Sequence, residues 1–291
     1  MFTRPLLALA LGVALTLTAC DSVQESSDDL TTAELSEVTQ IIADGLAEDT
    51  GGLFASAANA TSVVSEDGLV ATPLTLRGYV DGRNPACGSG GTVNYDAETG
   101  THSVFYGCVV DLPTAGRNYQ ATLDYQFRDA TGGFIENPQA NQDAIATVDF
   151  SGEASGSTFF ARRTTEVTST FEQSAQWDLA GLDGDVASFT VRQERSGTNT
   201  YSSAANANAR AYTLEISGDD IQMVSRSNGA GGAAVGQLEV SLTVELMRRG
   251  ERVTRDVEGT VELTESGTAM LRLFGVPDFY QLSLGDGTVI G

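Results

Sequence analysis

The amino-acid sequence predicts an all-β protein: a large curved antiparallel meander, a barrel or half-barrel, covered by one N-terminal amphipathic helix. Three observations support this fold. Apolar and polar residues alternate along most of the chain after Leu74, which is the period of strands with one buried and one wet face. Short turn signals, such as SGDD at 217–220, separate the alternating runs. About a dozen such strands exceed what a flat open sheet accommodates, so the sheet has to curve.

Residues 1–19 have the layout of a signal peptide. Arg4 precedes an apolar run from Leu6 to Leu17, and small residues lead from there to Cys20. The apolar run is shorter than a membrane-spanning helix requires. We therefore expect a leader for export that is removed from the mature chain.

The tetrapeptide Leu17-Thr18-Ala19-Cys20 resembles the lipobox of bacterial lipoproteins. The resemblance implies cleavage before Cys20, a diacylglyceryl thioether on its sulfur and usually a further acyl chain, such as palmitate, on its new amino group. Two or three acyl chains anchor a protein stably to a membrane. Residues 20–30 then hold the lipidated cysteine and a flexible acidic linker with the sequence DSVQESSDD. The alternative is an ordinary signal peptide with a chance cysteine.

The lipobox implies a place in the cell envelope. Asp21 resembles the inner-membrane retention signal of some enteric bacteria, whereas the acidic run after it resembles surface-export signals in other phyla. We expect attachment to the outer membrane or cell surface, with the periplasmic face of the inner membrane as the alternative. The general layout also loosely resembles uncharacterised exported β-rich lipoproteins of the envelope, a resemblance that implies no specific function.

Residues 31–52 predict the amphipathic helix. Its apolar residues recur at helical spacing: Leu35, Val38, Ile42 and Leu46. Thr31 and Glu34 have the spacing of a capping box, and Gly51 and Gly52 supply a stop. We expect the apolar stripe to cover the sheet; the alternative is a surface for a partner or a membrane.

Residues 70–291 predict the antiparallel β domain. The clearest alternation lies at 119–127 and 237–246. Further strands are predicted at 144–150, 158–171, 187–201, 211–216, 221–225, 253–263, 269–274 and 279–284. The stretches 201–210 and 227–236 are the best candidates for loops. A transmembrane barrel has the same alternation, but the lipobox and the leading helix favour a tethered protein.

The stretch 87–108 predicts a hairpin. Residues 92–95 and 101–106 flank the turn DAETG, in which Gly100 suits a positive φ. If Val93 faces Val104 across this turn, then Tyr95 faces His102. His102, the chain's single histidine, is therefore expected on a strand near the hairpin tip, as a surface or cross-strand residue.

Cys87 and Cys108 come to the far end of the same two-stranded ribbon, where a slip in the glycine-rich segment 89–91 lets them meet. Export favours oxidation of this pair to a disulfide, and closing a loop of this length stabilises the fold by roughly 3 kcal/mol. A zinc site is the alternative, but zinc needs four ligands, or three and a water. The position of His102 at the hairpin tip leaves it far from both sulfurs.

Composition and the lack of known motifs argue against nucleic-acid binding and against several classes of catalytic or cofactor site. The net charge is −23, with 39 acidic and 16 basic residues and no lysine, so we expect no nucleic-acid partner. The sequence lacks GxSxG, HExxH and a P-loop. The glycine-rich run at 229–234 has no helix after it, and the acidic stretch 178–185 is a turn or a weak calcium site. We expect no catalytic residue, cofactor or metal.

The expected function is that of a lipid-anchored, non-catalytic binding or structural module. In one version, a barrel interior lined by the apolar face that carries Leu123, Tyr125, Phe127, Leu242 and Val244 holds a hydrophobic small molecule. In the other, the helix fills the curved sheet, and the acidic outer face meets an envelope protein. An envelope hydrolase with paired carboxylates is a third alternative, although no pair of acids stands out in the sequence.

Overall fold

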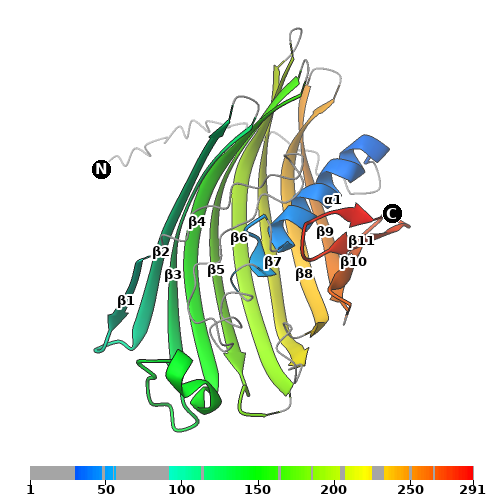
Figure 1. Ribbon diagram of the computed structural model, residues 1–291. Helices are drawn as coiled ribbons and strands as arrows, with labels where there is room; N and C mark the ends of the chain where they lie inside the picture. The colour runs from blue at the N-terminus through cyan, green and yellow to red at the C-terminus, as the bar shows by residue number, and fades with distance from the viewer. Residues whose placement is uncertain are drawn as a thin grey trace, which may run out of the picture.

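Twelve strands of the described chain form a single antiparallel sheet whose spatial order is the sequence order (Figure 1). The computed structural model describes residues 30–47, 50–54, 56, 92–112, 115–162, 165–184, 186–203, 207–224, 233–248, 251–264 and 266–290. The predicted all-β meander is confirmed, and the sheet is open, with β1 and β12 at its two edges. Residues 1–29 and 57–91, which include the predicted leader, the predicted lipobox and residues 20–29 of the predicted linker, lie outside the described residues.

The strands are β1 (Thr92–Asp96), β2 (Thr101–Leu112), β3 (Ala115–Arg128), β4 (Thr147–Arg162), β5 (Thr165–Ala180), β6 (Val186–Ser203), β7 (Ala207–Val224), β8 (Ala233–Arg248), β9 (Glu251–Leu263), β10 (Thr268–Leu273), β11 (Phe279–Ser283) and β12 (Val289–Ile290). A short 3₁₀ helix, η2 (Gln139–Ala144), lies between β3 and β4. The long central strands β4 to β8 give the sheet most of its height (Figure 1).

Three predictions along the strands were wrong. The predicted strand at 158–171 contains the end of β4 and the start of β5. The predicted loop at 201–210 contains the end of β6 and the start of β7. Around 155–159 and 196–200, successive residues are half-buried on both faces, so hydrophobic alternation fades there while the ladder of hydrogen bonds continues. The predicted turn at 217–220 is an irregularity inside β7, where Asp220 has a φ of 57° and the register shifts as in a β-bulge.

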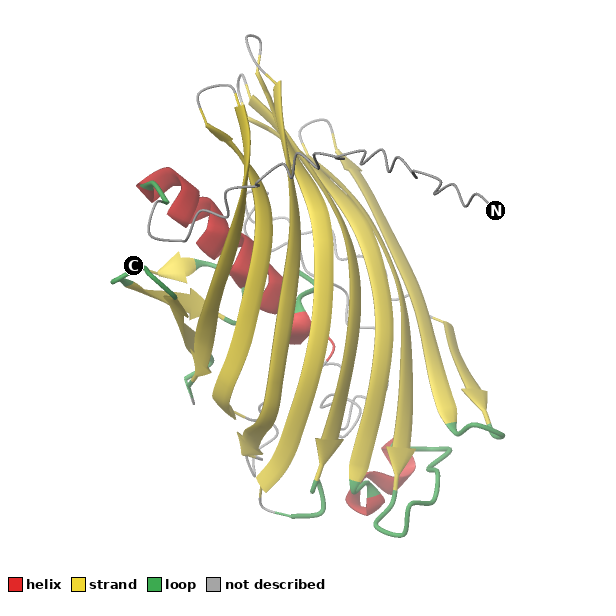
Figure 2. Cartoon of the chain, turned by 180° about the vertical axis from the view of Figure 1, so that it is seen from behind, coloured by secondary structure: helices red, strands yellow, loops and turns green. Residues whose placement is uncertain are grey.

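The helix α1 (Thr32–Leu46) lies across one face of the sheet, against β7, β8, β11 and β12 (Figure 2). The predicted capping box between Thr31 and Glu34 is confirmed. The helix ends at Leu46, earlier than predicted, because Ala47 is extended, with φ −69° and ψ 147°. None of the described helices is long and apolar enough to cross a membrane.

The face that α1 covers holds the core, and we call it the inner face; the opposite face is the outer face. Val38, Ile42 and Leu46 of α1 are fully buried against it, which confirms the predicted role of the apolar stripe. Away from the helix, the inner face carries a cluster of rings. Trp177 stacks on Phe150 with ring centroids 4.7 Å apart, and its Nε1–H donates to Ser56 Oγ at 2.9 Å.

Candidate functional site

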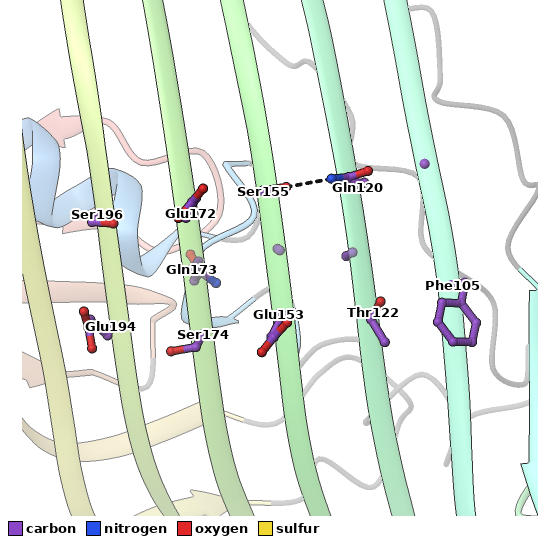
Figure 3. A pocket seen from close by; sticks show the side chains of 13 residues that line it. Phe105, Gln120, Thr122, Glu153, Ser155, Glu172, Gln173, Ser174, Glu194 and Ser196 are labelled. Atoms are coloured by element: carbon purple, nitrogen blue, oxygen red, sulfur yellow. Dashed lines mark hydrogen bonds between the residues drawn. The ribbon is translucent and has the colours of Figure 1, made fainter.

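The outer face of β3 to β6 is hollowed over a volume of about 850 Å³ (Figure 3). We call this the outer hollow and define it by its polar side chains: Gln120, Thr122, Glu153, Ser155, Glu172, Ser174, Glu194 and Ser196. Phe105 of β2 lies at one end of it. Alternation along four neighbouring strands therefore brings hydroxyl, amide and carboxylate groups onto one curved surface.

A second hollow, of about 570 Å³, adjoins the first and shares Gln120, Ser155, Glu172 and Ser196 with it. It continues toward β7, where Thr213 joins the lining. The two hollows together form one shallow polar groove across β3 to β7.

Three glutamates on three neighbouring strands form a triangle in the outer hollow (Figure 3). Glu153 and Glu194 are both cross-strand partners of Ser174, one on each side. Glu172 lies one outward position further along β5, so it is the diagonal neighbour of both. Diagonal neighbours in a sheet lie about 7–8 Å apart. On β7, Glu215 stands directly opposite Glu194, and directly opposed like charges destabilise a sheet.

Three arginines of the outer face pair with acids outside the hollow. Arg128 contacts Asp149 at 3.2 Å, Arg192 contacts Asp219 at 3.7 Å, and Arg252 contacts Glu245 at 3.3 Å. Among the residues that the structure describes, no cation pairs with a glutamate of the outer hollow. Within the described part of the chain, the hollow is therefore a region of negative charge without an ion-paired cation.

The inner face carries a cluster of polar side chains where α1 ends. Three side chains of β5 and β6 donate to backbone carbonyls of α1 and the turn after it. The Nε2 of Gln193 donates to Gly45 O at 2.8 Å, and Arg195 Nη1 donates to Asp44 O at 3.2 Å. Gln173 Nε2 donates to Gly51 O at 3.1 Å. The last carbonyls of a helix have no partner within it, so here the sheet caps the helix.

Charged side chains reinforce this contact. Glu37 of α1 forms an ion pair with Arg210 of β7, and the Arg195 guanidinium lies 4.2 Å from the centre of the Phe171 ring. Burial raises the pKa of Asp44, while the positive charge of Arg195 and a hydrogen bond from Gln40 act in the opposite direction. The position of α1 thus depends on polar contacts as well as on its apolar stripe.

The apolar residues assigned to a ligand site are all buried: Leu123, Tyr125, Phe127, Leu242 and Val244. Next to Leu123, beneath Gly51 and Ser56, the inner face encloses a cavity of about 20 Å³. A cavity of that size has room for about one water molecule. The cavity at this position is thus too small for a hydrophobic ligand.

His102 lies on β2 opposite Tyr95 of β1, and Val104 lies opposite Val93, as predicted. The turn between these strands places Gly100 at φ 70°. The expectation of a surface position was wrong, because the His102 ring is 3% exposed. It lies on the inner face, and segment 129–146 covers it there.

The predicted cysteine sites fall largely outside the described residues. Cys20 and Cys87 both lie outside them; Cys108 is part of β2, where its Cα partner is Tyr119. The disulfide therefore stays a prediction. The glycine-rich run at 229–234 also lies largely outside, and Asp178 of the acidic stretch is near the end of β5.

Carboxyl groups with a raised pKa lie outside the outer hollow. Besides Asp44, the pKa of Asp178 is raised, first by burial and second by the charge of Asp149, its cross-strand partner. Neither Asp44 nor Asp178 lines the outer hollow. In the described part of the chain, no three His, Cys, Asp or Glu side chains are grouped so that they hold a metal ion.

Comparison of the chain with protein-family models, with curated proteins and with solved structures gives no match. The site is therefore described from its residues alone. The sequence predicted an acidic outer face, but it indicated neither the outer hollow nor the cluster of polar side chains at the end of α1. One signal for the latter was present: Gln173 and Arg195 occupy apolar positions of the alternation, and they are direct cross-strand partners.

Proposed function

We propose that this protein is a lipid-anchored, non-catalytic binding module of the cell envelope, and that its outer hollow receives a cationic segment of a partner protein. The observation that carries the proposal is the uncompensated charge of Glu153, Glu172 and Glu194 in a preformed groove. Complementary charge steers a cationic partner into such a groove and orients it there. Serine and glutamine side chains between the acids supply hydrogen-bonding groups for its backbone.

A direct test is the binding of a short oligoarginine peptide, measured by titration calorimetry at low and at physiological salt. We expect the triple change Glu153→Gln, Glu172→Gln and Glu194→Gln to weaken binding about tenfold at low salt, since each exposed charge contributes a few tenths to 1 kcal/mol. Added salt should weaken binding to the wild-type protein, because it screens exposed charges.

The matched control removes the same charge from the same face, away from the hollow. Glu239, Glu258 and Glu262 are exposed on the outer face of β8 and β9, and their replacement by glutamine should leave the affinity nearly unchanged. Equal weakening in the two triple variants would mean that only the overall charge attracts the peptide, and the outer hollow would lose its assigned role.

The anchoring part of the proposal has its own test. Replacing Cys20 by serine removes the sulfur that the lipobox assigns to the diacylglyceryl group, and we expect the protein to leave the membrane fraction of its host. The mass of the mature wild-type N-terminus should show the acyl chains. Membrane association that survives the Cys20→Ser change would refute the lipid anchor.

A further inference from the structure

Segment 129–146, which connects β3 to β4, folds back onto the β1–β2 hairpin at the lower end of the sheet (Figure 1). Its Phe134 ring lies against Gly100 at the hairpin turn; a Cβ atom there would be 2.2 Å from the ring. The Arg128 guanidinium lies 4.3 Å from the centre of the same ring. Ile135 and Ile145 of the segment are buried in the core, so the segment closes this end of the inner face.

His102 joins the hairpin to this segment. Its Nε2–H donates to the backbone carbonyl of Ile135 at 3.0 Å. The ring lies 4.5 Å from the Tyr95 ring and 5.4 Å, edge to face, from the Phe127 ring. A neutral imidazole satisfies this arrangement, because one ring nitrogen carries a proton for Ile135 and the aromatic neighbours require no charge.

A second proton on His102 is unfavourable while the segment is closed. Burial lowers the pKa of His102, and the Ile135 carbonyl and the negative charge of Glu136 oppose this shift only partly. Glu136 is exposed, so water screens its attraction. The other titratable groups nearby are Tyr95 of β1 and Tyr125 of β3, the cross-strand partners of His102, and Asp129. The Asp129 carboxylate accepts hydrogen bonds within its own turn, from Thr131 and Gly133.

We propose that segment 129–146 is a proton-operated latch, closed on the β1–β2 hairpin while the His102 ring is neutral and released when the ring is protonated. Release exposes His102 to water, which solvates the charged ring. It also uncovers the end of the inner face that Ile135 and Ile145 close. The latch does not depend on the outer hollow, because it lies on the other face of the sheet.

The direction of the pH effect follows from proton binding. The closed state binds a proton on His102 less readily than the open state, in which the ring has its ordinary pKa of about 6.5. The stability of the closed state is therefore fully present above about pH 6.5. It falls as the pH drops through this value and stops falling below the lowered pKa of the closed state.

Hydrogen exchange of single amides tests the latch. The Ile135 N–H donates to Phe127 O and the Ala146 N–H donates to Arg128 O, so both amides exchange only when the segment opens. Between about pH 7.5 and pH 5 we expect their opening constant to rise about tenfold for each unit of pKa difference on His102. Amides in the β5–β6 ladder serve as the reference and should show no such rise.

The matched control is His102→Gln, which keeps an amide donor for Ile135 and removes the titration. Comparing the wild-type protein with this variant at each pH removes two other pH effects, because both proteins share them: the pH dependence of the intrinsic exchange rate and the titration of Asp44 and Asp178. The same rise in the variant, or an equal rise in the β5–β6 ladder, would overturn the latch. Phe134→Ala provides a second variant: it should loosen the segment at both pH values and leave the ratio between them unchanged.

A measurement on the wild-type protein completes the test. Because the chain has a single histidine, its ring resonances in an NMR titration need no assignment. We expect a pKa below about 6.5, and we expect the Phe134 and Gly100 signals to change over the same pH range. A histidine pKa at or above the ordinary value would rule the latch out.

Discussion

Replacing Trp177 by alanine is expected to lower the free energy of unfolding by about 3–5 kcal/mol, the usual loss for a large aromatic ring in a core. Trp177 is 1% exposed and stacks on Phe150, with the Phe189 ring centroid 5.7 Å away on the next strand. Truncation leaves a cavity among rings that rigid strands prevent from collapsing. Urea denaturation followed by circular dichroism measures the loss.

Trp177→Phe is the matched control. It keeps an aromatic ring next to Phe150 and removes the hydrogen bond that Trp177 Nε1 donates to Ser56 Oγ. The expected loss is roughly 1–2 kcal/mol, because a smaller ring remains and one buried hydrogen bond disappears. If alanine and phenylalanine cost the same, then the hydrogen bond to Ser56 and not ring packing dominates at this position.

Replacing Arg195 by methionine is expected to destabilise the protein by about 2–3 kcal/mol at neutral pH. Arg195 donates to the Asp44 carbonyl, and its positive charge opposes the effect of burial on the Asp44 carboxylate. Removing one partner of a buried hydrogen bond costs about 1–3 kcal/mol, and more when a charge is involved. Without Arg195, the pKa of Asp44 rises further, because burial then acts with less opposition. When the folded protein raises the pKa of a carboxyl, the free energy of unfolding falls as the pH rises toward that pKa. The loss of stability caused by Arg195→Met should therefore be smaller in acid.

The double variant Arg195→Met with Asp44→Asn isolates this effect. An asparagine at position 44 keeps an oxygen that accepts from Gln40, as Asp44 does at 2.8 Å, and it carries no charge. Most of the stability should return at neutral pH, and the pH dependence should disappear. A double variant as unstable as Arg195→Met would instead assign the loss to the contacts of Arg195 with Phe171 and the Asp44 carbonyl.

Strands could be located from the sequence where one face of the strand is apolar and the other is polar. In β3 and β8 the core positions alternate strictly, and both strands were located correctly. The ends of β4 to β7 were not, because successive residues around 155–159 and 196–200 are half-buried on both faces. The hydrogen-bonded ladder continues there without an alternation of burial. Their pairing depends on neighbouring strands, which a single strand's sequence does not reveal.

The candidate site was predictable only in part. The pairing of His102 with Tyr95 followed from the hairpin register, but its burial depends on segment 129–146, which comes from elsewhere in the chain. In the outer hollow, Glu172 becomes the diagonal neighbour of Glu153 on one side and of Glu194 on the other. That arrangement requires the register of the β4–β5 and β5–β6 ladders, which the sequence alone does not define.

The order of the strands has a consequence for how the chain folds. Each strand pairs with its neighbour in sequence, so the sheet can form one hairpin after another, and the connection 129–146 between β3 and β4 is a longer loop to close. The helix α1 is the exception, since Gln40 donates to Gly287 O across 247 positions. The helix α1 emerges before the sheet during synthesis, yet its binding surface is complete only when the last strands have arrived. Until then, the apolar stripe of α1 has no surface to cover, and a chaperone that shields it would protect the chain from aggregation.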